Sequence, residues 1–188
     1  DIFPHFSAIK PMHVLPALRQ VLRQNRATLK RILKQPKRDW QHIMVPLAKM
    51  DQALHQMWAP VSHLNAVNHT DALQKVYEKA LVLLTDYGNE LSHHEGLYQA
   101  FCAISERPDF KQLSVARQTV IEHALRDFRL AGVHLSAAKK TKIKQHYHQL
   151  SALSQQFSSH LLAATNAWTM HVDDRKSLDG LPETALQT

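Results

Sequence analysis

Apolar residues recur at helical spacing along almost the whole chain, and this pattern constrains the fold more than any other feature of the sequence. The leucines that follow Pro11 are separated by three, four or seven residues, as on the buried face of an amphipathic helix: Leu15, Leu18, Leu22, Leu29 and Leu33. Pro11 suits a first helical turn, and Pro36 cannot continue a helix. We therefore expect a long first helix between these two prolines.

The same periodicity predicts five further helices, so that the expected fold is all-α with about six long, antiparallel helices. Thr70 or Asp71 is the expected N-cap of the third helix, and Gly132 is well placed to end the fifth. Trp40, Trp58 and Trp168 are expected to anchor a core or a contact between domains. The expected helices begin at about Asp39, Thr70, His94, Ser114 and Ser136, with a non-helical connector at Ala59–Asn65.

The helical periodicity of the apolar residues ends at about Trp168. Thr169–Val172 is expected to be a short extended segment, and Gly180–Glu183 resembles the start of a new helix, with proline in its first turn. A helix that begins this close to Thr188 suggests that the chain is a piece of a longer protein.

Composition excludes several classes of protein. The 188 residues contain only four glycines, spaced too far apart for the glycine-rich loops that cradle phosphates, and tight β-hairpins are disfavoured. Cys102 is the single cysteine, so a scaffold of internal disulfides is impossible. No apolar run approaches the roughly 18 residues that cross a bilayer. A chain of this length buries about 70% of its unfolded surface and needs no disulfide or metal for stability.

The basic residues are concentrated at one end. Nine of the 23 lysines and arginines lie between Lys10 and Arg38, a segment without any acidic residue, and the rest of the chain is slightly acidic. Five of them follow the helical period beside the leucine face: Arg19, Arg23, Arg26, Lys30 and Lys34. No aromatic side chain lies among them to stack on bases, so we interpret this basic ridge as a solvated helix face.

Histidine, cysteine and carboxylate residues, which could bind a metal or act in catalysis, form no complete motif in this sequence. His94-Glu95 begins like the zinc-protease motif HExxH, but Tyr98 replaces the second histidine, and no other pair of the 14 histidines has that spacing. Glu90 and His93 have the spacing of half a di-iron site, and no second half exists.

Cys102 lies in an apolar stretch typical of an inert thiol. Three acidic residues lie four positions from a histidine, and we interpret them as helix-surface contacts: Asp51/His55, Glu90/His94 and His123/Asp127. We therefore expect no catalytic residue and no metal ligand in this chain.

Longer strings carry a resemblance to a known family. In order and spacing they are similar to the N-terminal region of the thimet-oligopeptidase family of zinc metallopeptidases, bacterial members above all, although Met12 stands where that family more often has glutamate. The matching strings cover nearly the whole chain: Phe6–Leu18, Ala59–Val67, His94–Tyr98, His123–Gly132, Leu153–Phe157, Ala163–Thr165 and Trp168–Thr169.

The resemblance implies a cytoplasmic enzyme that hydrolyses short peptides in a channel between two helical lobes. The family's zinc ligands lie far downstream, so the zinc cofactor belongs to a part of the protein outside this chain, and no substrate-binding residue can be assigned here. Residues 1–168 would form the N-terminal lobe and a wall of the channel, and residues 169–188 would begin the connection to the catalytic domain, which is the expected partner. The chain alone is expected to be inactive, with no nucleic acid or membrane as partner.

Two alternatives stay open at this point. One is a stand-alone helical module that buries an apolar seam against a partner protein. The other is a basic helical domain that binds RNA or a membrane surface through Arg19, Arg23, Arg26 and Lys30.

Overall fold

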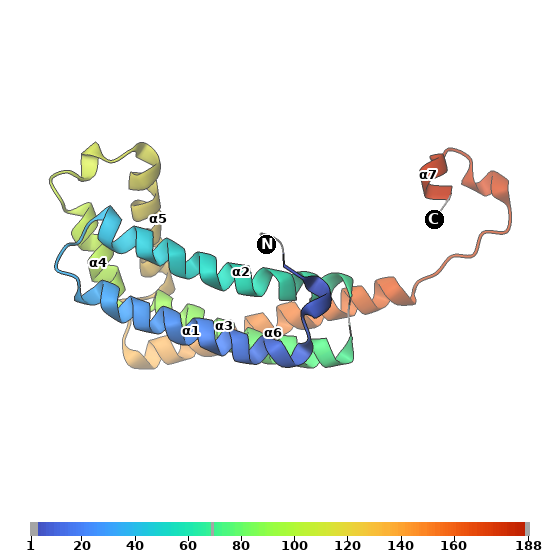
Figure 1. The fold of residues 1–188 in the computed structure, drawn as a ribbon, viewed down its shortest axis with the longest axis horizontal. Helices are drawn as coiled ribbons and strands as arrows, with labels where there is room; N and C mark the ends of the chain where they lie inside the picture. Colours follow the sequence, from blue (N-terminus) through green and yellow to red (C-terminus); the bar gives the residue numbers. More distant parts are fainter. Residues whose placement is uncertain (1–3, 69, 187–188) are drawn as a thin grey trace. The chain divides into compact units, whose positions relative to one another are not determined.

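A computed structural model of the chain describes residues 4–68 and 70–186, and confirms that they form an all-α fold (Figure 1). Six of the seven α-helices in these residues have more than ten residues. The helices are α1 Pro11–Lys34, α2 Val45–Val67, α3 Asp71–Ser92, α4 Glu95–Ser105, α5 Val115–Ala131, α6 Ala137–Ala167 and α7 Glu183–Leu186. Short turns of other helical types lie at Phe6–Ala8, Trp40–Met44, Phe110–Gln112 and Arg175–Leu178. The chain divides into two compact units, Asp1–Ser151 and Ala152–Thr188, and the boundary falls within α6.

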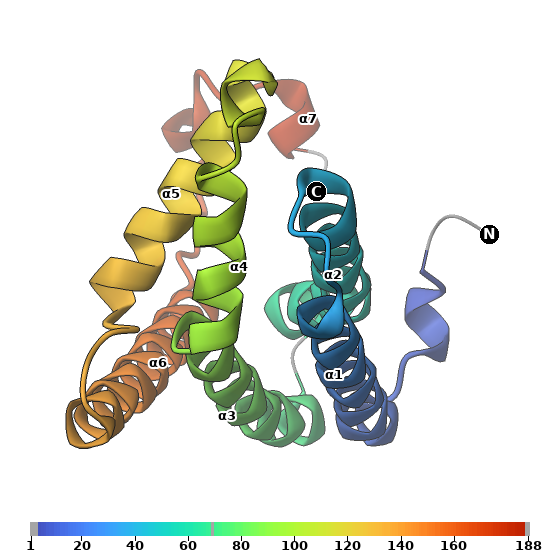
Figure 2. The same ribbon diagram turned by 90° about the vertical axis from the view of Figure 1, so that its left-hand side faces the viewer.

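The first unit is a layer of long helices with a helical hairpin at one end. Helices α1, α2 and α3 run side by side, and the α4–α5 pair crosses their end (Figures 1 and 2). The first half of α6 lies beside α3. Helix α1 packs against α2, α3 and α4, which makes it the central helix of the unit.

Two apolar clusters form the core of this unit, and α1 contributes to both. Val14, Leu18 and Leu22 pack with residues of α2 and α3, which we name the α1–α3 cluster. Leu29 and Ile32 belong to the α4–α5 cluster, which includes Phe101, Ile121 and Phe128. The predicted leucine face is thus correct for Leu18, Leu22 and Leu29, while Leu15 and Leu33 are half-buried. Each fully buried leucine or isoleucine stabilises the fold by roughly 1.5–3 kcal/mol relative to an exposed one.

Asn25 lies on α1 between the residues that enter the two clusters, and it is only 4% exposed. Its side-chain amide donates a hydrogen bond of 3.0 Å to the carbonyl oxygen of Met50 on α2. A buried amide without a partner is costly, so this bond favours one register of α1 against α2.

Two boundaries differ from those expected. The predicted connector at Ala59–Asn65 is wrong, because α2 continues through Pro60 to Val67. Val61 is 3% exposed in the α1–α3 cluster, and this packing outweighs the hydrogen bond that Pro60 cannot donate. Asp39, where the second helix is expected to begin, is a cap: its carboxylate accepts from the backbone N–H of His42 at 2.9 Å. A π-helical turn then intervenes before α2 begins at Val45.

Other helix ends follow the sequence closely. Thr70 caps α3 by accepting from the backbone N–H of Leu73 at 3.2 Å, and Pro11 is the first residue of α1. Gly132 ends α5 with φ of +88°, a left-handed conformation that glycine adopts without strain. Trp40 and Trp58 pack against the two clusters as expected. Trp168 is 69% exposed and belongs to neither cluster.

The second unit is small. It contains the second half of α6, the turn at Arg175–Leu178 and α7. Thr169–Val172 is irregular, so the predicted extended segment forms no strand, while α7 begins at Glu183, one residue after Pro182, as the sequence predicts. None of the helices in the described ranges is long and apolar enough to cross a membrane.

Glycines 88 and 132 give opposite predictions for replacement by alanine. Gly88 lies inside α3, and no described atom lies within 4 Å of an added Cβ, so Gly88→Ala should raise the free energy of unfolding by about 0.5–1 kcal/mol. A Cβ at Gly132 would collide with Leu135 in a left-handed backbone, so Gly132→Ala should lower the free energy of unfolding by more than about 1 kcal/mol. Urea unfolding of both variants measures the two changes, and equal signs would contradict the described geometry.

Candidate functional site

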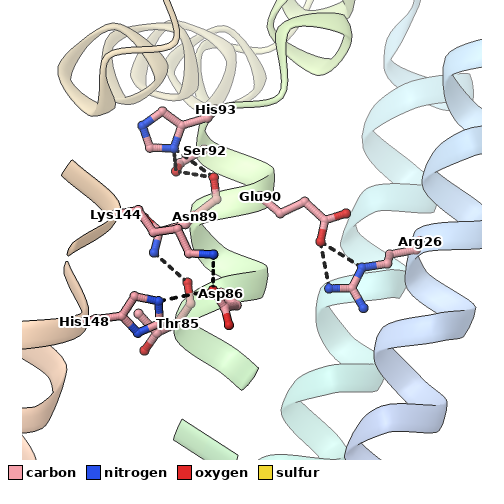
Figure 3. A network of polar contacts seen from close by, with 9 residues as sticks. All are labelled: Arg26, Thr85, Asp86, Asn89, Glu90, Ser92, His93, Lys144 and His148. Carbon is pink, nitrogen blue, oxygen red and sulfur yellow. Dashed lines mark hydrogen bonds and ion pairs between the residues drawn. The ribbon is translucent and has the colours of Figure 1, made fainter. Parts of the chain in front are cut away.

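Polar side chains gather along α3 and form a network with residues of two other helices (Figure 3). Asp86, Asn89, Glu90 and His93 are spaced by three and four residues, so the α-helix projects them on one side. Residues of α1 and α6 approach this face from either side. The network therefore links three helices that are distant in sequence.

On the side of α1, Glu90 forms an ion pair with Arg26. The Arg26 Nε and Nη2 atoms lie 2.8 and 2.7 Å from the same carboxylate oxygen. The guanidinium also lies over the ring of Tyr87, 5.5 Å from its centre. The hydrogen bond to Glu90 raises the pKa of Arg26 above its ordinary value. Arg26 is thus held by α3, while Arg19, Arg23, Lys30 and Lys34 on the basic ridge are exposed.

On the side of α6, Asp86 contacts two side chains. Lys144 contacts its carboxylate, and the Nε2 atom of His148 lies 3.1 Å from the same oxygen. The hydrogen bond from Lys144, with a further contribution from His148, lowers the pKa of Asp86. Two more polar contacts extend this attachment, from Thr85 to Ser151 at 3.1 Å and from Lys140 to Glu95 at 2.8 Å.

An open cavity of about 460 Å³ lies among these groups, lined by residues of α1, α3 and α6. Its charged groups neutralise one another in pairs, Arg26 with Glu90 and Lys144 with Asp86. His93 also lines it: its Nδ1 atom lies 2.9 Å from the carbonyl oxygen of Asn89, and its buried Nε2 atom has no hydrogen-bond partner in the described part of the chain. Such paired charges hold neighbouring helices together.

The incomplete HExxH string has a structural role. The Nδ1 atom of His94 accepts from the backbone N–H of Leu97 at 3.2 Å, which makes His94 the N-cap of α4. Glu95 binds Lys140, and the ring of Tyr98 packs edge-on against Phe128 at 5.9 Å. The three side chains therefore serve a helix start, an ion pair and a core contact.

The other residue pairs considered in the sequence do not form sites either. Glu90 turns to Arg26, while His93 bonds its own helix, so they do not converge. Asp127 pairs with its neighbour Arg126 at 2.9 Å rather than with His123. Cys102 is half-buried against the α4–α5 cluster, consistent with a packing role. Among the described residues, no group of three or more histidine, cysteine or carboxylate side chains is placed to hold a metal ion.

The network on α3 was not predicted as a site. Its residues were visible only as the local pairs Glu90/His93 and Glu90/His94, because the partners of Asp86 and Glu90 lie on α6 and α1, about 60 residues away in sequence. The signal that could have found it is the spacing of Lys144 and His148, which lie one helical turn apart and so can reach a single carboxylate.

Comparison with known proteins defines the class of this helical domain. The family model described as Neurolysin/Thimet oligopeptidase, N-terminal domain, matches residues 18–140. The chain belongs to this family, as an N-terminal domain similar to that of oligopeptidase A. This confirms the resemblance that the sequence strings carry.

The relatives are much longer than this chain. Oligopeptidase A of Haemophilus influenzae is 39% identical over 184 residues, which are 98% of this chain and 27% of that protein. Oligopeptidase A of Escherichia coli K12 is 37% identical, over 97% of this chain and 27% of the relative. The probable cytosolic oligopeptidase A of Arabidopsis thaliana is 32% identical, over 98% and 26%. The chain thus spans about a quarter of the length of these relatives.

Asp86 should make stability depend on pH and salt. Its pKa is lower in the folded than in the unfolded chain, so its contribution is present above about pH 4, the unfolded value, and is lost as the pH falls through the folded value. At pH 7 we expect Asp86→Asn to lower the free energy of unfolding by less than about 1 kcal/mol, since the carboxylate is 36% exposed.

Urea unfolding at pH 7 and at pH 3, with and without 1 M salt, measures this effect, and the difference from wild type should shrink in acid and in salt. Asp127→Asn is the matched control, because that carboxylate is 63% exposed and its ion pair is with the adjacent residue Arg126. An undiminished difference at pH 3 would contradict an ionic role for Asp86.

His94 should behave as a cap and not as a metal ligand. His94→Ala removes the acceptor for the Leu97 N–H and should lower the free energy of unfolding by about 1 kcal/mol, whereas His94→Asn should restore most of it. Added zinc should shift the thermal midpoint of wild type and variant equally. Zinc stabilisation that disappears in His94→Ala would show that the histidine binds metal.

Proposed function

We propose that this chain is the N-terminal, non-catalytic lobe of a zinc-dependent oligopeptidase, and that it forms a wall of the channel in which short peptides are hydrolysed. The observation that carries the proposal is the match over 97–98% of this chain to proteins named oligopeptidase A, of which it covers about a quarter. Their activity is assigned by their names, and its transfer to the parent of this chain is part of the proposal.

The chemistry of the described residues supports a role other than catalysis. Asp86, Glu90 and Glu95 are engaged by cations from neighbouring helices, His94 caps a helix and Cys102 packs against a core cluster. The zinc expected in a full-length enzyme does not fit the described residues, which bring no sufficient set of ligands together. We therefore assign no step of peptide hydrolysis to a residue of this chain.

In this proposal residues 1–168 supply the lobe, and residues 169–188 begin the connection to a catalytic domain, which is the main partner. The lobe contributes shape: long helices fixed by two core clusters limit which substrates reach a channel. We propose a cytoplasmic location, in keeping with the word cytosolic in the name of the Arabidopsis thaliana relative.

The purified chain should not hydrolyse peptides. We expect a quenched fluorescent oligopeptide to stay intact when incubated with the chain and zinc, while full-length oligopeptidase A of Haemophilus influenzae serves as the positive control. The expected reason is that the described residues bring together no group of ligands for a zinc ion, which would activate the attacking water. Hydrolysis that a chelator abolishes and zinc restores would refute the assignment as a non-catalytic lobe.

A further inference from the structure

Helix α6 is attached to the first unit without burying any of its own residues. All of its residues are described, and none is buried. Its first half is held to α3 and α4 by polar contacts, through Lys140, Lys144, His148 and Ser151. Tyr147 and Leu150 remain 41% and 59% exposed although they lie at helical spacing on one face. A helix in a folded domain gains most of its stability from burying an apolar face, and here that face is uncovered.

A groove of about 400 Å³ lies where α6 runs beside α3, and its lining is mostly apolar. We name it the α3/α6 groove, and it is lined by Thr85, Gly88, Asn89, Ser92, Tyr147, Leu150 and Ser151. Gly88 opens it, because no described atom lies within 4 Å of the place where a Cβ would be. Glycine is unfavourable inside a helix, and no described residue packs into the space that its missing side chain leaves. A close approach by something outside the described residues gives this glycine a physical reason.

The charge pattern indicates which kind of molecule approaches. No aspartate, glutamate, lysine or arginine occurs between Lys144 and Asp173. The centres of protein–protein interfaces are depleted of charged residues, whereas a helix on a membrane surface or on a nucleic acid carries lysine and arginine. In the second unit the same helix exposes Leu153, Phe157 and Leu161 by 63%, 70% and 58%. The uncharged surface therefore fits a protein partner.

We propose that the α3/α6 groove is the docking surface for a helix from the rest of a full-length oligopeptidase, which packs its apolar ridge between α3 and α6 over Gly88. This inference rests on the proposed function and names the surface through which the lobe joins its partner. A groove between two antiparallel helices, lined by a glycine, suits the ridge of a third helix. In the Haemophilus influenzae relative, about three quarters of the residues lie outside the matched region and can supply such a helix.

A substitution at Gly88 tests the proposal through opposite effects in two proteins. Gly88→Leu should leave the isolated chain at least as stable as wild type, because leucine favours the helix and meets no described atom at its Cβ. In a chimera in which this chain replaces the matched region of Haemophilus influenzae oligopeptidase A, the same side chain should fill the docking surface. The thermal midpoint of the chimera should therefore fall by several degrees.

Ala72→Leu is the matched control, since it adds the same side chain to an exposed position on α3 outside the groove. It should leave both midpoints nearly unchanged. If Gly88→Leu leaves the chimera as stable as Ala72→Leu does, the groove is not the docking surface, while the proposed function stands. If the unsubstituted chimera neither folds nor hydrolyses peptides, the proposed function itself fails.

Photo-crosslinking identifies the occupant directly. A benzoylphenylalanine at Leu150 in the chimera should crosslink to the relative's part of the same polypeptide, and one at Leu130, which is 76% exposed on α5, should not. A crosslink from position 150 between two copies of the protein would overturn the proposal in favour of self-association. The absence of any crosslink from position 150 would also overturn it.

Discussion

The passage of α1 through both apolar clusters is the constraint on which the first unit depends. Its N-terminal half packs with α2 and α3 and its C-terminal half with α4 and α5, so one helix fixes two cores relative to each other. Asn25 lies between them and bonds the backbone of α2, where a shift in register would leave a buried amide unpaired. The basic ridge is the solvated side of this same helix, and Arg26 turns from it to bind Glu90.

The first half of α6 is attached by a different kind of force. Apolar burial holds α1 to its neighbours. Ion pairs and hydrogen bonds hold α6 to α3 and α4, and the carboxylates of Asp86 and Glu95 accept the ion pairs. Partly exposed ion pairs contribute little stability and are screened by salt. The helix is therefore positioned by its polar side while its apolar residues stay available for a further contact.

The sequence predicts the helices well because they depend on local periodicity and capping, as the leucines of α1, Thr70 and Gly132 illustrate. It fails at Pro60, where the burial of Val61 outweighs a local signal that normally ends a helix. It also fails for the α3 network, since the partners of Asp86 and Glu90 are brought together only by the tertiary fold. The sequence shows that the HExxH string lacks its second histidine, while the N-cap role of His94 is visible only in the fold.

Gly88 is a position where both the local helix and the tertiary fold must be considered. Glycine inside a helix costs roughly 1 kcal/mol relative to alanine, and no described neighbour makes use of the space at Gly88. If Gly88 produced a bend, α3 would be interrupted there, yet the helix is continuous from Asp71 to Ser92. If Gly88 allowed another described residue to pack closely, that residue would lie near its Cα. Among the described residues Gly88 lines a groove instead. Open space over Gly88 is the geometry that the proposed docking of a third helix requires.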